Sequence, residues 1–183
     1  MDTLANQPLC ATGRQRDSCC IDNHMSGAYE ERVRDQFKGA GIVLDNALAF
    51  WVHRVYQVVR NETYRAFREA GTELTPEQWV VLVRLWEQDG RSQSDLCDST
   101  FRDRPTMSRM IDTLEARGLV TREPLPSDAR ARIVYLTREA KALKPKLVPV
   151  ARGIVDRMLD GIADEDLATT RRTLQRIFEN LDR

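Results

Sequence analysis

Apolar residues recur every three or four positions over six segments of this 183-residue chain, which predicts six amphipathic helices. The segments are residues 44–68, 76–89, 93–100, 104–117, 138–162 and 164–181. A shorter stretch, residues 26–41, places Tyr29, Val33 and Phe37 four positions apart and predicts an extra N-terminal helix that ends at the glycines 39 and 41. Residues 1–25 have no sustained period, so we expect a flexible tail there.

Residues that start helices support these boundaries. Thr75 followed by Pro76 is typical of a cap and a first helical position, and Ser92, Asp103 and Thr137 precede the other helices as caps. The stripes expected to be buried are Trp79, Leu82, Val83 and Trp86 in the second helix and Met107, Met110, Ile111 and Leu114 in the fourth.

The period changes after Gly118. Residues 119–124 and 133–136 are rich in β-branched and apolar residues and predict two strands. Residues 126–130 between them have the composition of a turn, with Pro, Ser and Asp. The two strands therefore form a hairpin whose tip is basic.

The order helix, short helix, turn, helix and hairpin is that of a winged helix-turn-helix. We therefore predict a mainly α fold with a small two-stranded β wing. The winged helix-turn-helix lobe covers residues 73–137, and a helical arm is built from residues 42–72 and 138–183.

The fourth helix has the composition of a DNA recognition helix. Its face opposite the buried stripe carries Arg104, Thr106, Ser108 and Arg109, and Arg102 precedes it. Short hydroxyl side chains fit a major groove without clashing, and a guanidinium group can bind guanine edges or a phosphate. The partial positive charge of the helix N-terminus also favours a phosphate.

The hairpin tip carries Arg130 and Arg132, which suit the negative potential of a narrow minor groove, and Asp128 can pair with Arg130 and orient it. The whole chain has 28 basic and 28 acidic residues, so its net charge of zero does not attract it to DNA. Between residues 101 and 138, however, eight arginines face five acids, a local charge of +3. Because the chain is rich in arginine everywhere, a merely solvated surface remains an alternative for this patch.

Three blocks of sequence together resemble the MarR family of winged-helix bacterial transcription factors. The blocks are LTPEQWVVLVRLWEQDGRSQSDLC, DRPTMSRMIDTLEARGLVTR and PSDARARIVYLT. Ser108 and Arg109 stand where the family usually has Thr-Arg in the recognition helix, and Asp128 and Arg130 match its wing motif. Ala129 is a departure, because a second basic residue is common at that position.

The resemblance implies a homodimer that places two lobes on a palindromic operator, more often as a repressor than as an activator. The helices of residues 42–72 and 138–183 have more apolar positions than one lobe can cover, which agrees with a dimerisation region. Family members often bind small aromatic or phenolic anions between arm and lobe. Trp51, His53, Arg54 and Trp79 are the local candidates for such a pocket, although tryptophans at helical spacing are more often core residues.

Other classes of function have less support. The chain has no phosphate-binding glycine loop, no catalytic triad pattern and no metal-ligand spacing, so we expect neither an enzyme nor a cofactor. It has no signal peptide and no membrane span, so we expect a cytoplasmic protein with reduced cysteines. Two alternatives remain: a helical interaction module that has lost DNA binding, and a thiol-based redox sensor using Cys97 or the cysteines of the tail.

Overall fold

The computed structural model describes residues 37–38, 41–125 and 128–182, of which 37, 38, 42, 125 and 128–131 are described by their backbone alone. The chain divides into two compact units, Met1–Trp51 and Val52–Arg183. In the described part of the first unit, β1 (Phe37–Lys38) pairs antiparallel with β2 (Gly41–Ile42), and a 3-10 turn, η1, follows at Leu44–Asn46.

The extra helix expected at residues 26–41 is only partly testable. Residues 26–36 and 39–40 lie outside the described residues, as does the expected tail at 1–25. At Phe37 and Lys38 the helix prediction is wrong, because these residues pair as a strand with Ile42 and Gly41. A backbone extended in this way cannot make the hydrogen bonds of a helix four residues apart.

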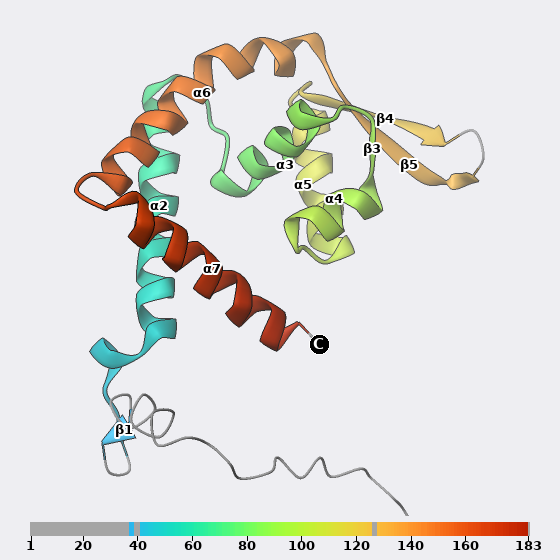
Figure 1. The fold of residues 1–183 in the computed structure, drawn as a ribbon. Coiled ribbons are helices and arrows are strands. Elements are labelled where there is room, and N and C mark those ends of the chain that lie inside the picture. Colours follow the sequence, from blue (N-terminus) through green and yellow to red (C-terminus); the bar gives the residue numbers. More distant parts are fainter. Residues whose placement is uncertain (1–36, 39–40, 126–127, 183) are drawn as a thin grey trace, which may run out of the picture. The chain divides into compact units, whose positions relative to one another are not determined.

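The second unit contains the remaining elements, shown along the chain in Figure 1. Its helices are α2 (Leu48–Glu69, which begins in the first unit), α3 (Pro76–Glu87), α4 (Gln93–Thr100), α5 (Arg104–Ala116), α6 (Arg138–Leu159) and α7 (Asp164–Leu181). Its strands are β3 (Arg91–Ser92), β4 (Val120–Leu125) and β5 (Asp128–Leu136). The described fold is thus mainly helical with a small antiparallel sheet, as the sequence predicts.

The predicted caps are confirmed. Thr75 and Gln78 form a reciprocal capping box at the start of α3, and Ser92 and Asp95 do the same for α4. Thr137 begins α6 by accepting a hydrogen bond from the backbone of Ala140. Local sequence therefore sets where each of these helices starts.

The sheet has the order β3-β5-β4, so the wing rests on a third short strand that the sequence analysis missed. Arg91 and Ser92 pair with Val134 and Ile133 of β5. A two-residue strand carries no periodicity of its own, and only its position between α3 and α4 brings it to the sheet. Strands β4 and β5 extend together beyond the helices of the lobe (Figure 1).

The hydrophobic core joins α3, α4, α5, the base of the wing and the start of α6. Its largest fully buried side chains are Phe67, Leu74, Leu82, Leu85, Leu96, Met107, Ile111, Leu114 and Leu147. The predicted stripe of α5 is confirmed at Met107, Ile111 and Leu114, with Met110 partly buried.

The buried stripe predicted for α3 is wrong in part. The fully buried residues are Val81, Leu82 and Leu85, whereas Trp79 and Trp86 are partly buried at the edge of the core. Trp79 packs against Phe67 at 5.0 Å and against Trp86 at 5.2 Å between ring centroids. Large rings fit better at this edge, where the Trp86 ring nitrogen donates to the backbone oxygen of Ala140.

Candidate nucleic-acid interface

Helix α5, the predicted recognition helix, begins at the predicted cap, Asp103. The Asp103 carboxylate accepts hydrogen bonds of 2.8 Å from both the backbone N–H and the hydroxyl of Thr106. These two bonds lower the pKa of Asp103 below its ordinary value, so the cap stays ionised at neutral pH. The Thr106 hydroxyl therefore stabilises the first turn of α5. Because its hydrogen is used in the bond to Asp103, this hydroxyl can only accept hydrogen bonds from other groups.

Four of the arginines predicted to contact DNA have described side chains: Arg102, Arg104, Arg109 and Arg132. All four are exposed, and the ion pairs found within the described part of the chain include none of them. Ser108 lies between Arg104 and Arg109 along the chain and is half-buried. Arginine side chains that are exposed and without a carboxylate partner are available for phosphate oxygens or base edges.

A fifth arginine of the lobe, Arg122, has a different role. Its guanidinium group, on β4, pairs with Asp112 at 2.7 Å and donates through Nε and Nη2 to Glu115, both carboxylates being on α5. The hydrogen bond from Arg122 lowers the pKa of Glu115. The cluster ties α5 to the wing, and its one positive charge offsets part of the negative charge of the two acids.

The wing is longer than predicted. Residues 128–130 were expected in the turn, but β5 begins at Asp128, and Leu125 of β4 pairs with Asp128 after a register irregularity at Pro124/Leu125. The side chains of Asp128 and Arg130 lie outside the described atoms, so the ion pair expected between them stays a prediction. Arg132 is exposed on β5, where its backbone lies opposite Pro124.

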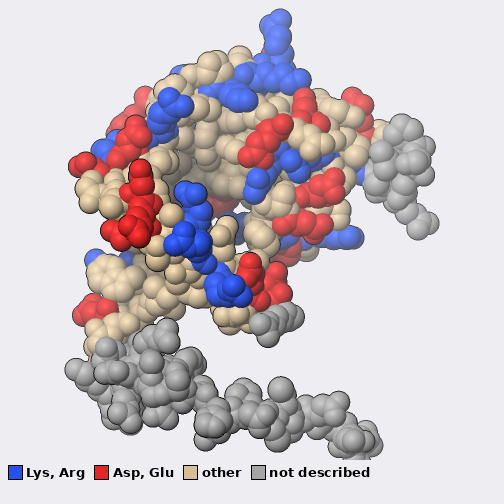
Figure 2. Space-filling view, viewed as in Figure 1, with Lys and Arg blue, Asp and Glu red and all other residues tan. Residues whose placement is uncertain are grey.

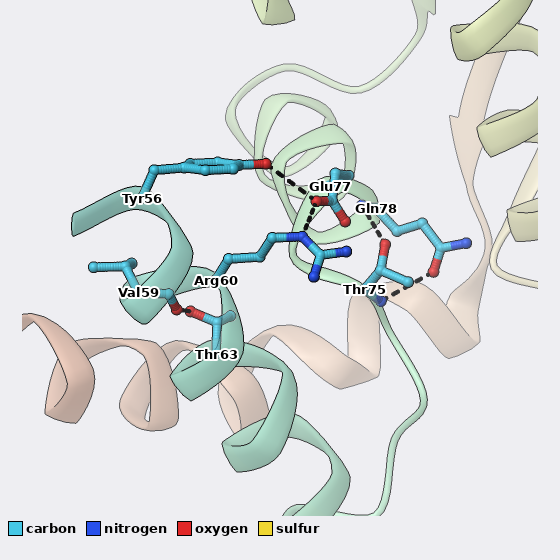
Figure 3. Close-up of polar contacts among 7 residues, drawn as sticks. All are labelled: Tyr56, Val59, Arg60, Thr63, Thr75, Glu77 and Gln78. Atoms are coloured by element: carbon cyan, nitrogen blue, oxygen red, sulfur yellow. Dashed lines mark hydrogen bonds and ion pairs between the residues drawn. The ribbon is translucent and has the colours of Figure 1, made fainter. Parts of the chain in front are cut away.

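A polar junction joins the arm helix α2 to the start of α3 (Figure 3). The Arg60 Nε donates to the Glu77 carboxylate at 2.8 Å, and the Tyr56 hydroxyl contacts the same oxygen at 3.4 Å. Burial raises the pKa of Glu77, but the hydrogen bonds to this carboxylate and the charge of Arg60 together outweigh burial and leave that pKa below its ordinary value. A carboxylate in the first turn also complements the helix dipole.

This junction continues to the recognition helix. Next to Glu77, the Gln78 Oε1 accepts from the Thr75 backbone N–H at 3.1 Å and from Arg117 at 3.3 Å. Arg117 follows α5 directly and also pairs with Glu73 at 3.2 Å. The sequence analysis predicted neither the contact of Arg60 with Glu77 nor the contacts of Arg117, because the partners lie 17 to 44 positions apart and share no local pattern.

The residues predicted to line a ligand pocket lie in different surroundings. His53 and Arg54 are exposed on α2, and Trp79 lies in the aromatic edge of the core. Trp51 belongs to the first unit, where its ring nitrogen donates to the backbone oxygen of Asp45 at 2.7 Å.

The second unit has a groove of about 530 Å³ between α2 and α6, lined by other residues. Its floor includes Ala66 and Ile154, and its rim carries Arg65 and Arg157, both paired with Glu62.

The remaining chemistry of the described residues is limited. Cys97 is buried in the core, and burial raises the pKa of its thiol. The cysteines 10, 19 and 20 lie outside the described residues. Among the residues that the structure describes, no three His, Cys, Asp or Glu side chains gather as a metal site. Nor does any helix of that part combine the length and hydropathy needed to cross a bilayer.

Charge is mixed over the surface. Figure 2 shows Lys and Arg side chains interspersed with Asp and Glu on the face in view, in keeping with a net charge of zero. Attraction to a polyanion would therefore depend on individual side chains held at the right places. The net charge of zero supplies no long-range attraction of the whole chain to a polyanion.

Comparison with known proteins agrees with this geometry. The model of the MarR family matches residues 74–131, which run from the end of the α2–α3 connection to the wing. The transcriptional regulator HosA of Escherichia coli O111:H- is 28% identical over 114 residues, covering 62% of this chain and 84% of HosA.

Two solved structures are also similar. CouR from Rhodococcus jostii RHA1, bound to p-coumaroyl-CoA, is 27% identical with a TM-score of 0.64, covering 74% of this chain and 94% of CouR. BpsR of Bordetella bronchiseptica, whose DNA binding is regulated by 6-hydroxynicotinic acid, is 25% identical with a TM-score of 0.68, and the match covers 75% of this chain and 97% of BpsR. A winged helix-turn-helix lobe on a helical arm, a family match over that lobe and these relatives agree with one another: over residues 74–131 this chain matches the MarR family of transcriptional regulators.

Proposed function

We propose that this protein is a homodimeric, sequence-specific DNA-binding regulator, most simply a repressor. In this proposal residues 73–137 bind the duplex, and residues 42–72 and 138–183 join two copies. The observation that carries it is the exposure of Arg104 and Arg109 on α5, a helix firmly capped by Asp103, in a lobe whose Arg122 pairs with two acids of the same helix.

Each predicted contact has a chemical role in this proposal. Arg109, one turn into α5, binds a guanine edge or a phosphate in the major groove, and Arg104 at the first helical position binds a phosphate. Arg102, Thr106 and Ser108 add contacts at the same end of the helix. Arg130 and Arg132 of the wing bind the adjacent minor groove, with Asp128 orienting Arg130.

The dimer is proposed from the apolar surface of the arm. In the second unit, large apolar side chains of α2 and of the α6–α7 region remain exposed: Val52, Val55, Tyr56, Val58, Val155, Met158, Ile162 and Leu174. Soluble monomers rarely expose so many on neighbouring elements. A two-fold partner would bury them and would place two recognition helices for a palindromic operator.

The test starts from duplexes selected by the full-length protein out of a random pool. Fluorescence anisotropy at several salt concentrations then measures the affinity of the wild type, Arg109→Ala and Arg152→Ala. Arg152 is an exposed arginine of α6 and serves as the matched control. We expect Arg109→Ala to cost about 1–3 kcal/mol of binding free energy and Arg152→Ala to leave binding unchanged.

The salt dependence separates operator binding from the alternative of an interaction module. Wild-type affinity should fall steeply as salt rises, with a slope of about −0.9 per phosphate contact. If no duplex is enriched, or if both arginine variants lose affinity equally, DNA binding through α5 is refuted and the interaction module is favoured.

We further propose that a small aromatic or phenolic ligand releases the DNA. Two relatives support an aromatic ligand: CouR was solved with p-coumaroyl-CoA, a thioester that carries a phenolic ring, and the DNA binding of BpsR is regulated by 6-hydroxynicotinic acid. Of the residues predicted to line the pocket, His53, Arg54 and Trp79 belong to the second unit and are the ones proposed to bind it. Thermal-shift titration of wild type and Arg54→Ala with those two compounds tests this: stabilisation of the wild type alone supports the assignment, and no shift with either compound contradicts it.

A thiol-based sensor has weaker support than the ligand. Reactive cysteines need an exposed thiol with a lowered pKa, whereas Cys97 is buried and its pKa is raised. If Cys97→Ser abolished a peroxide-dependent loss of DNA binding, the sensor would regain support.

A further inference from the structure

The turn of the helix-turn-helix contains an unusual residue, Phe101. It has φ 53° and ψ 45°, the left-handed conformation that normally favours glycine or asparagine, and no other non-glycine residue of the described chain has a positive φ. This conformation ends α4, because it lets the Arg102 N–H reach the Cys97 backbone oxygen at 3.1 Å. A phenylalanine in this position costs stability that a glycine would not.

The ring of Phe101 does not contribute to the core of the lobe. The residue is 71% exposed, so its side chain offsets little of that backbone strain by burial. The ring instead packs against Phe178 near the end of α7, with ring centroids 4.7 Å apart and planes at 63°. This edge-to-face arrangement is the favoured geometry for two aromatic rings.

The pair therefore connects the helix-turn-helix to the last helix of the arm. Phe101 lies two residues before the cap Asp103, so whatever holds Phe101 also restrains the first turn of α5. Phe178 is itself 43% exposed and lies on a helix whose apolar side chains Leu174 and Leu181 face solvent. The contact thus joins the surface of the helix-turn-helix to the surface of α7. Without it, we would expect these two elements to move relative to each other.

We propose that Phe101 and Phe178 are positioning residues for DNA binding. Their contact holds the turn of the lobe against α7, and so sets the distance between the two recognition helices of a dimer. This inference rests on the proposed function, since it concerns how a dimer measures the spacing of its half-sites. Each base pair inserted between two half-sites moves one of them by about 3.4 Å along the duplex axis and rotates it by about 34° around that axis, relative to the other half-site. A dimer whose lobes are held rigidly therefore binds less well to half-sites with a changed spacing.

The first experiment tests the contact without DNA. Amide hydrogen exchange is followed for the peptide spanning residues 97–106 in full-length wild type, Phe178→Ala and Leu181→Ala. Leu181 is a matched control, because it lies on the same helix and is 81% exposed. We expect faster exchange in Phe178→Ala and wild-type exchange in Leu181→Ala; equal exchange in all three proteins refutes the contact.

The second experiment tests whether the contact between Phe101 and Phe178 sets the preferred spacing of the half-sites. Duplexes carrying the half-sites selected by the wild type are made with one base pair removed, with the selected spacing, and with one or two added. We expect Phe178→Ala and Phe101→Asn to reduce the preference for the selected spacing by about two- to tenfold, the factor that one aromatic pair is worth. Asparagine tolerates the left-handed backbone, so Phe101→Asn removes the ring without adding strain.

A merely structural role would lower affinity for every duplex equally and leave the spacing preference unchanged, which overturns the proposal. If the wild type binds no duplex, the proposed function fails and the positioning role fails with it. The exchange experiment then still decides whether the contact between the turn and α7 exists.

Discussion

Asp89 joins the end of α3 to the base of the wing, and its removal gives a sharp test of how the wing is held. The Asp89 Oδ1 accepts hydrogen bonds from the backbone N–H groups of Leu136 at 2.8 Å and Gly90 at 3.0 Å. Its other oxygen pairs with Lys141 in the first part of α6 at 2.9 Å. One carboxylate thus connects the loop after α3, the last residue of β5 and α6.

The expected loss follows from these partners. Leu136 is buried, so Asp89→Ala leaves a buried backbone N–H unsatisfied, at a cost of about 1–3 kcal/mol in the free energy of unfolding. The ion pair with Lys141 is largely exposed and adds about 0–1 kcal/mol. Asp89→Asn keeps an acceptor oxygen for Leu136 and should lose about 1 kcal/mol or less.

Urea unfolding at one protein concentration measures both variants, with Glu87→Ala, an exposed residue at the end of α3, as the control. Each kcal/mol corresponds to a shift of about 2–4 °C in Tm for a chain of this size. The reasoning is refuted if Asp89→Asn lowers the free energy of unfolding as much as Asp89→Ala does, or if neither variant differs in it from Glu87→Ala. In either case the hydrogen bonds between Asp89 and the backbone do not hold the wing.

The pH dependence gives a second check with a definite sign. Burial raises the pKa of Asp89, but the hydrogen bonds from Leu136, Lys141 and Gly90 and the charge of Lys141 together outweigh burial and leave that pKa lowered. A lowered pKa stabilises the fold above the unfolded-state pKa of about 3.9, and this contribution is lost as the pH falls through the folded-state value. The stability difference between wild type and Asp89→Asn should therefore be full at pH 6 and shrink below about pH 4. A difference that stays constant down to pH 2.5 contradicts this reasoning.

Three further predictions concern the same lobe. Gly90→Ala should cost about 1–2 kcal/mol in urea unfolding, because Gly90 has φ +74° and an added Cβ would lie 2.7 Å from the Tyr135 ring; an unchanged midpoint would show that the turn adjusts. Thr75→Ala should cost about 1 kcal/mol and Thr75→Ser much less, since only the hydroxyl completes the capping box of α3; equal losses would assign the effect to the methyl group. Arg122→Met should raise the pKa of Glu115 toward its ordinary value in an NMR titration and weaken DNA binding, because it exposes uncompensated acids on α5; an unchanged Glu115 titration would exclude the ion pair in solution.

The features of this fold that could be predicted from the sequence are those that depend only on residues close together along the chain. The caps Thr75, Ser92 and Asp103 were predictable, because a cap acts on backbone N–H groups three residues away and needs no tertiary information. The buried stripe of α5 was predictable for the same reason, since helical spacing alone places Met107, Ile111 and Leu114 together.

Features set by tertiary packing could not be predicted in this way. Strand β3 is two residues long and exists only because β5 passes beside it. The early start of β5 at Asp128 runs against the turn composition of residues 126–130, since pairing with Leu125 overrides local preference. In α3, helical spacing places Trp79 and Trp86 on one side of Leu82 and Val81 and Leu85 on the other, and spacing alone could not tell which side faces the core.

Charge shows why a candidate site needs geometry as well as composition. Counting residues 101–138 gives a local charge of +3, but the count treats all eight arginines alike. The structure separates them: Arg122 and Arg117 are held by carboxylates, whereas the ion pairs among the described residues include neither Arg104 nor Arg109. Under the proposed function, the paired arginines reduce the repulsion that acids on or near α5 would exert on a phosphate backbone. Arg104 and Arg109 would then bind the duplex without first breaking such an ion pair, so a chain with a net charge of zero would bind a polyanion at one place and in one orientation.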